Sequence, residues 1–127
     1  MPKRPKLYIL FLCVALVSAF ALVSSASGAS YRVRASGDRW MPDLKRIVKG
    51  DKIVWANPTG AEHDVKSYRW NSRRWTKDAF LAPGQQTSKR FRSVGTFKYR
   101  CRLHSFYNPN NGNCRGMCGV VKVRKRL

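Results

Sequence analysis

Short runs of alternating hydrophobic and polar residues recur along the chain and predict an all-β protein. In residues 96–101, for example, Phe97, Tyr99 and Cys101 fall on one face of a strand and polar residues fall on the other. No long amphipathic helical pattern interrupts the series. The pattern favours an antiparallel Greek-key β-sandwich or barrel of about seven strands. The expected strands are 31–35, 44–48, 52–56, 63–68, 87–93, 96–101 and 119–125.

Two segments between these strands need separate interpretation. Lys49-Gly50-Asp51 joins the runs 44–48 and 52–56 and predicts a hairpin-like turn between them. Residues 69–80 show no clear alternation, so a short helix and an irregular excursion are both open for them.

The amino-terminal segment has the pattern of a secretory signal. Basic residues at 3–6 precede an apolar run at 7–23, and small residues at 24–30 follow it. This order predicts a signal peptide over residues 1–29, cleaved near Ala29 and taking Cys13 with it. A retained membrane anchor is the alternative, but an apolar run of about 17 residues is short for a membrane span. We favour cleavage and therefore a secreted or extracytoplasmic protein, in the periplasm or at the cell surface.

The remaining domain, residues 30–127, is strongly basic. The whole chain has 26 Lys and Arg against 6 Asp and Glu, a formal charge of +20, and loss of the signal lowers it to +17. Such a charge attracts anionic partners. In an exported protein this favours an acidic protein, an anionic cell-wall polymer or a membrane surface, and argues against nucleic acid. A role in solubility alone is the simpler alternative.

Catalytic patterns are lacking in the sequence. It has no phosphate-binding glycine loop, and its six acidic residues are too scattered for paired-carboxylate chemistry. We therefore expect that the protein is not an enzyme.

Most of the candidate metal ligands lie near the carboxyl terminus. The chain has only two histidines, His63 and His104; Cys101 lies three residues before the second, and Met117 precedes the last predicted strand. Two imidazoles, one thiolate and a weak axial thioether form the ligand set of a blue-copper site. With Cys114 and Cys118, the domain has three cysteines, of which two can pair in an oxidising compartment.

A structural zinc site is the main alternative for these residues. Cys101, His104, Cys114 and Cys118 supply three thiolates and one imidazole, which is an accepted zinc ligand set. That arrangement leaves His63 without a role, whereas a copper site uses it.

The order of these motifs resembles the small cupredoxins of the plastocyanin and amicyanin kind. The similarity covers nearly the whole domain, in the stretches 40–57, 63–65, 82–91, 95–104 and 116–123. It implies a Greek-key β-sandwich that binds one copper ion. The implied ligands are His63, Cys101, His104 and Met117. It also implies a monomer that passes single electrons between redox proteins, the partner here being acidic. A secreted copper carrier or storage protein is the alternative within the same fold.

The segment between the second histidine and the methionine departs from this family. Twelve residues, 105–116, separate His104 from Met117, whereas the familiar small cupredoxins have only a few. Within the resemblance, we expect a Cys114–Cys118 disulfide that closes this enlarged loop and leaves Cys101 as the thiolate.

Overall fold

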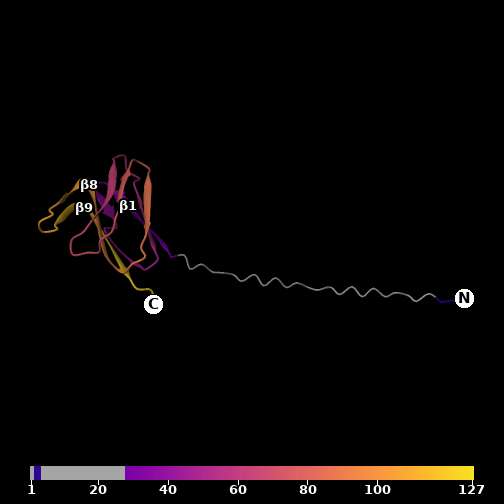
Figure 1. Cartoon of the computed structure of the whole chain (residues 1–127). Coiled ribbons are helices and arrows are strands. Elements are labelled where there is room, and N and C mark those ends of the chain that lie inside the picture. The colour runs from indigo at the N-terminus through magenta and orange to yellow at the C-terminus, as the bar shows by residue number, and fades with distance from the viewer. Residues whose placement is uncertain (1, 4–27) are drawn as a thin grey trace.

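Strands dominate the computed structural model, which describes residues 2–3 and 28–127 (Figure 1). Most of the predicted signal peptide, with Cys13, lies outside the described residues, so its cleavage stays a prediction. Nine strands follow one another along the described chain. They are β1 (Ser30–Ser36), β2 (Arg39–Met41), β3 (Leu44–Val48), β4 (Lys52–Ala56), β5 (His63–Tyr68), β6 (Asp78–Leu81), β7 (Gln86–Arg90), β8 (Gly95–Tyr107) and β9 (Cys114–Arg124).

The strands form two sheets, as a β-sandwich requires. One sheet has four strands in the order β2-β1-β4-β7, and the other has five in the order β3-β9-β8-β5-β6. The predicted all-β sandwich is therefore confirmed. The sheets are mixed rather than wholly antiparallel, because β1 runs parallel to β4 and β3 runs parallel to β9.

The predicted hairpin at residues 49–51 is wrong. The flanking strands β3 and β4 belong to different sheets, so this turn carries the chain across the sandwich. Asp51 is buried there and accepts hydrogen bonds from the backbone N–H groups of Ala29 and Val48, each at 2.9 Å. Local alternation predicts two strands and a turn, but it cannot say which neighbours each strand will pair with.

The segment 69–80 is an irregular excursion that ends in an unexpected strand. Residues 69–77 form no helix or strand, and β6 then pairs with β5 at the edge of the five-stranded sheet. Trp75 fixes the excursion to the body. Its indole N–H donates to the carbonyl of Lys98 at 2.9 Å, and its ring stacks on Trp55 with centroids 6.2 Å apart.

The core lies between the sheets and is rich in aromatic side chains. Trp55 and Tyr99 meet edge to face with centroids 5.2 Å apart, and both are fully buried. Cys101 and Met117 belong to the same buried cluster. Its other members are Val33, Ala35, Trp40, Ile47, Ile53, Val65, Leu81, Phe91, Phe97, Val121 and Val123.

Strands β8 and β9 extend beyond the sandwich as a hairpin arm, residues 105–116. Figure 1 shows this arm projecting from the body of the domain. Ser105, Phe106 and Tyr107 pair with Gly116, Arg115 and Cys114 in antiparallel register. The enlarged segment is therefore mostly an extension of the β8–β9 ladder with a short turn at its tip.

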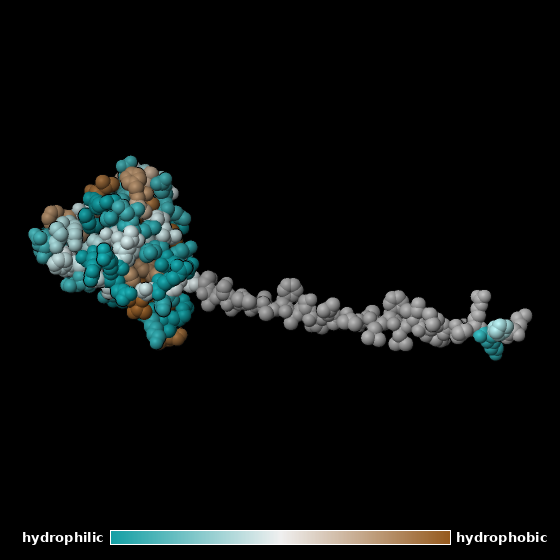
Figure 2. Space-filling view, viewed as in Figure 1, coloured by the Kyte–Doolittle hydropathy of each residue, from teal (hydrophilic) through white to brown (hydrophobic). Residues whose placement is uncertain are grey.

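The visible surface is mainly hydrophilic, with hydrophobic residues in small separate patches (Figure 2). The described residues include no helix of the length and hydrophobicity that a membrane crossing requires.

Candidate metal centre

Three of the four predicted ligands converge at one end of the five-stranded sheet. His63 is the first residue of β5, and Cys101 and His104 lie three residues apart in β8. One ligand atom from each lies within 4.8 Å of the other two. His63 and Cys101 are fully buried, whereas the side chain of His104 is 24% exposed.

Both imidazole rings present Nδ1 to the cysteine sulfur. His63 Nδ1 lies 3.1 Å from His104 Nδ1, and Cys101 Sγ lies 3.5 Å from His104 Nδ1 and 3.9 Å from His63 Nδ1. A metal ion bound to imidazole nitrogens at about 2.0 Å and a thiolate at about 2.3 Å holds such atoms roughly 3 to 4 Å apart. The spacing of the three atoms therefore fits a single shared metal ion.

A bulge in β8 places two of these side chains on one side of the ladder. Arg100 pairs with Cys118 and Ser105 pairs with Gly116, so four residues of β8 oppose the single residue Met117 of β9. The four residues, 101–104, include both Cys101 and His104. The extra length bends β8 so that residues three apart reach the same point.

Met117 is fully buried in the cluster that contains Cys101. Its position opposite the bulge places it beside the segment 101–104, although twelve residues separate it from His104 in sequence. The arm makes this possible, because its paired strands leave the body after His104 and return before Met117. Gly116 completes the return with φ +89°, and a β-carbon there would lie 2.5 Å from the carbonyl oxygen of His104.

The predicted Cys114–Cys118 disulfide is present, with Cα atoms 6.1 Å apart. It encloses Met117 within a five-residue loop of β9. Among the described cysteines, Cys101 alone is a free thiol. The two paired sulfurs are not available as the thiolates that the zinc alternative needs.

The second nitrogen of each histidine meets a polar side chain. His63 Nε2 lies 3.0 Å from Thr59 Oγ1, and His104 Nε2 lies 3.4 Å from Asp38 Oδ1. Contacts of this kind fix the orientation of metal-binding imidazoles and hold Nδ1 toward the metal. Thr59 Oγ1 also donates to Asn57 Oδ1 at 2.6 Å, which ties it to the loop before His63.

Asp64 and Arg102 hold the ligand segment of β8 against β5. The carboxylate of Asp64 accepts hydrogen bonds from the backbone N–H and from Nε of Arg102, each at 2.6 Å. The backbone N–H of Asp64 in turn points to Cys101 Sγ at 3.4 Å. Because Asp64 is buried and Arg102 lies between Cys101 and His104, this pair fixes the segment from which both side chains project.

The two buried candidate ligands, His63 and Cys101, differ in how their protonation affects metal binding at neutral pH. Burial lowers the pKa of His63, and the charge of His104 lowers it further. Burial raises the pKa of the Cys101 thiol, although backbone N–H groups, beginning with that of Asp64, oppose the rise. Without a metal, His63 is therefore a neutral imidazole that is ready to bind a cation, and Cys101 is a thiol. Binding would replace its proton.

The sequence interpretation missed the residues that support the ligands. Thr59 belongs to an Asn-Pro-Thr-Gly loop, where short polar side chains commonly bond to nearby backbone and side-chain groups, and this signal was readable. Asp38 gave no such signal, because its contact with His104 joins distant parts of the chain.

No protein-family model matches the chain, and no curated protein matches it. Solved structures do match. The copper-containing nitrite reductase from Thermus scotoductus SA-01 has 18% identity and a TM-score of 0.63, over 77% of this chain and 23% of that one. This chain thus spans about a quarter of the reductase.

Two small proteins match over most of their own length. The purple cupredoxin from Nitrosopumilus maritimus has 19% identity and a TM-score of 0.56, covering 73% of this chain and 98% of that chain. A reduced amicyanin variant has 22% identity and a TM-score of 0.59, covering 78% and 85%. With the two sheets and the grouped side chains of His63, Cys101 and His104, these likenesses show that the chain has the cupredoxin fold.

Proposed function

We propose that this chain is an exported cupredoxin that carries single electrons on one bound copper ion. His63, Cys101 and His104 are the strong ligands, and Met117 is the weak axial ligand. The observation that carries the proposal is the convergence of two Nδ1 atoms and one thiol sulfur within a cupredoxin fold. Copper, when bound, supplies the one-electron couple between Cu(I) and Cu(II).

The donor set favours copper over zinc. One thiolate, two imidazoles and a buried thioether suit both oxidation states of copper, whereas the zinc alternative needs three thiolates. The disulfide occupies two of the three domain cysteines. His63, which the zinc alternative leaves unused, lies within the group.

The protein's own part in electron transfer is to hold these side chains still. The β8 bulge, the Asp64–Arg102 pair and the polar contacts of both rings fix the positions of the donor atoms. Ligands that need no rearrangement allow the metal to change oxidation state with little movement. His104 is the strong ligand that reaches the surface, so electrons enter and leave by its exposed edge.

Other features of the chain support a location and a kind of partner for this function. The signal-like segment supports export, and residues 30–127 form the copper domain. The charge of +17 supports an acidic redox partner, or attachment to an anionic wall or membrane. We propose a monomer that acts as a carrier between enzymes and is not itself an enzyme.

The first test is the spectrum of the copper-loaded protein. The full chain would be expressed with export, and the purified product titrated with one equivalent of Cu(II). We expect an intense visible thiolate-to-copper absorption and narrow copper hyperfine splitting in the paramagnetic-resonance spectrum. Cys101→Ser should abolish the absorption, and His63→Ala should abolish or strongly change it. A colourless protein that binds zinc instead would refute the proposal.

A second measurement separates electron transfer from copper storage. A reversible potential in voltammetry, together with rapid electron self-exchange between the two oxidation states, is expected for a carrier of electrons. Tight retention of Cu(I) with very slow exchange would instead favour the copper-storage alternative.

A further inference from the structure

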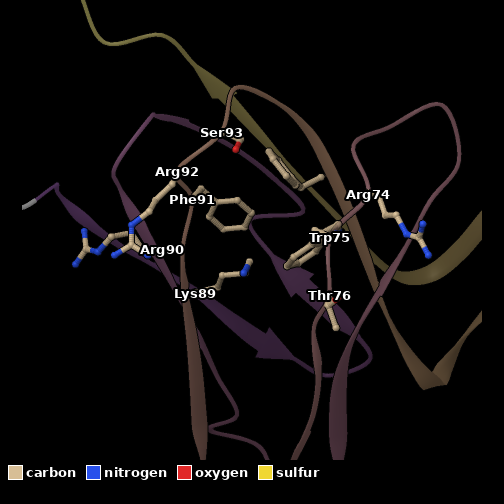
Figure 3. Close-up of a pocket in the computed structure, with 9 residues that line it drawn as sticks. Arg74, Trp75, Thr76, Lys89, Arg90, Phe91, Arg92 and Ser93 are labelled. Carbon is tan, nitrogen blue, oxygen red and sulfur yellow. The ribbon is translucent and has the colours of Figure 1, made fainter.

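A groove of about 380 Å³ lies between residues 74–76 of the irregular excursion and residues 89–93 at the end of β7. Figure 3 shows the rings of Trp75 and Phe91 next to each other, with centroids 5.5 Å apart, and the side chain of Lys89 near them. Arg90 and Arg92 stand on one side, and Arg74 stands on the other. The groove therefore has an aromatic floor and cationic edges.

The cations of this groove have no acidic counterpart in its wall. Among the described residues that line it, four are Lys or Arg and none is Asp or Glu. The acids with ion pairs are engaged elsewhere: Asp64 and Asp78 bind Arg102, and Asp51 binds Arg126. Like charges gathered without a counter-ion repel one another, so an anion placed here would be stabilised by all of them.

A fifth cation adds to the same field. Lys77 follows the groove wall and donates from Nζ to the carbonyl of Ser88 at 2.9 Å, beside Lys89. Burial lowers the pKa of Lys77, and the nearby charge of Lys89 lowers it further. The two ammonium groups are thus close enough to repel each other.

Both walls of the groove are fixed in place. On one side, the backbone N–H of Arg73 donates to Thr96 at 2.8 Å, and the indole of Trp75 donates to Lys98. On the other side, the backbone N–H of Phe91 donates to Asp51 at 2.9 Å. Arg90 donates from one guanidinium nitrogen to the carbonyl of Gly50 at 2.6 Å. Binding would therefore cost little ordering of the backbone.

The groove is separate from the metal centre. Arg90 pairs with Lys52 at the start of β4, whereas β4 ends at Ala56 and leads into the loop before His63. The cations thus lie at the opposite end of these strands from the ligand histidines. None of the groove residues is a proposed ligand or one of the contacts that orient the ligands.

We propose that this groove is a binding site for an oxyanion group of the phosphate or sulfate type. Guanidinium groups offer paired N–H donors that match tetrahedral oxyanions, and Lys89 adds a mobile point charge. The same group occurs as a free ion and as the repeating unit of a surface polyanion. A polymer would bind the groove through one of its anionic units. This would hold the exported protein near the surface that carries the polymer and leave the metal centre accessible.

The test compares two variants with equal loss of charge. The groove variant carries Arg74→Gln, Lys89→Gln and Arg92→Gln. The control carries Arg32→Gln, Arg34→Gln and Arg39→Gln, all exposed positions on β1 and β2 of the four-stranded sheet. Calorimetric titrations at physiological ionic strength would use inorganic pyrophosphate and linear polyphosphate as probes. The groove variant should bind about tenfold or more weakly than the unchanged protein, and the control within about twofold.

Further readouts keep this result interpretable. Thermal unfolding would establish that each variant is folded, and Arg92→Gln alone, at an exposed position, should already weaken binding. In NMR spectra, the Trp75 indole and the amides of residues 89–93 should shift on titration. Saturable binding of pyrophosphate identifies a small-ion site, whereas groove-dependent binding of polyphosphate alone identifies a polymer subsite. Equal weakening in both triple variants, or no binding of either probe, would overturn the proposal.

Discussion

The two sheets of this sandwich differ in what they contribute to the proposed copper site. All four proposed ligands lie on the five-stranded sheet: His63 on β5, Cys101 and His104 on β8, and Met117 on β9. The four-stranded sheet contributes none of the proposed ligands. It supplies buried residues such as Trp40 and Trp55 on its inner face.

The difference between the sheets lies in their regularity. β1, β4 and β7 pair without a register shift, so successive side chains point to opposite faces of the sheet. β8 breaks this rule between Arg100 and Ser105, and the break gathers Cys101 and His104 opposite Met117. A regular sheet can support a site, but here an irregular strand brings the side chains of Cys101 and His104 together.

The largest loss of stability is expected from a substitution in the core of the four-stranded sheet. Trp55 is fully buried against Trp75, Phe91 and Tyr99, so Trp55→Ala removes contacts that nothing nearby replaces. We expect a loss of about 3–5 kcal/mol in the free energy of unfolding. Urea unfolding measures it, with the exposed Arg32→Gln as a control that should change by less than about 0.5 kcal/mol. The visible absorption of the copper-loaded protein, per folded molecule, should be unchanged. Its loss would show that the four-stranded sheet also determines the geometry of the copper site.

A smaller effect is expected at the base of the arm. Replacing both cysteines, Cys114→Ser with Cys118→Ser, opens the five-residue loop around Met117 and should cost about 2 kcal/mol, the entropy of so short a loop. The copper spectrum should change in band shape and keep its thiolate absorption, since Cys101 is untouched. An unchanged spectrum would mean that the bulge, and not the disulfide, positions Met117.

The smallest effect is expected at Asp64. Asp64→Asn keeps the shape of the side chain and removes its charge opposite Arg102. Because Arg102 is 43% exposed, we expect a cost of only about 1 kcal/mol in thermal unfolding experiments. The copper absorption should nevertheless shift, because the Asp64 carboxylate also accepts from the backbone N–H of Arg102, the residue that follows Cys101. A stability loss with an unshifted spectrum would limit Asp64 to a structural role.

Much of the fold could be predicted because alternation is a local property. The seven expected strands all occur, and the two additional ones, β2 and β6, are short edge strands of three and four residues. The pairing could not be predicted in the same way. Whether β3 continues into β4 in one sheet or crosses to the other depends on burial of Asp51 and on partners more than 20 residues away.

The candidate site could be predicted from the chemistry of the candidate ligands and their order in the sequence. The residues that orient these ligands could not be predicted. His63, Cys101 and His104 were expected together and are found together. The sequence showed that the segment 105–116 is long. It did not show that residues 105–107 pair with residues 114–116 as a continuation of the β8–β9 ladder. Residues 108–113 are turn-forming polar residues, which do not by themselves fix the register of the flanking residues. The contacts of Asp38 and Arg102 with the site depend on tertiary structure alone.

The projecting arm separates distance along the chain from distance in space. Each added pair of residues, one on β8 and one on β9, lengthens the arm outward and leaves Met117 opposite the bulge. Motif searches that require a short, fixed gap between the last histidine and the methionine would therefore reject chains built like this one. A search that allows a hairpin of variable length at that point would retain them.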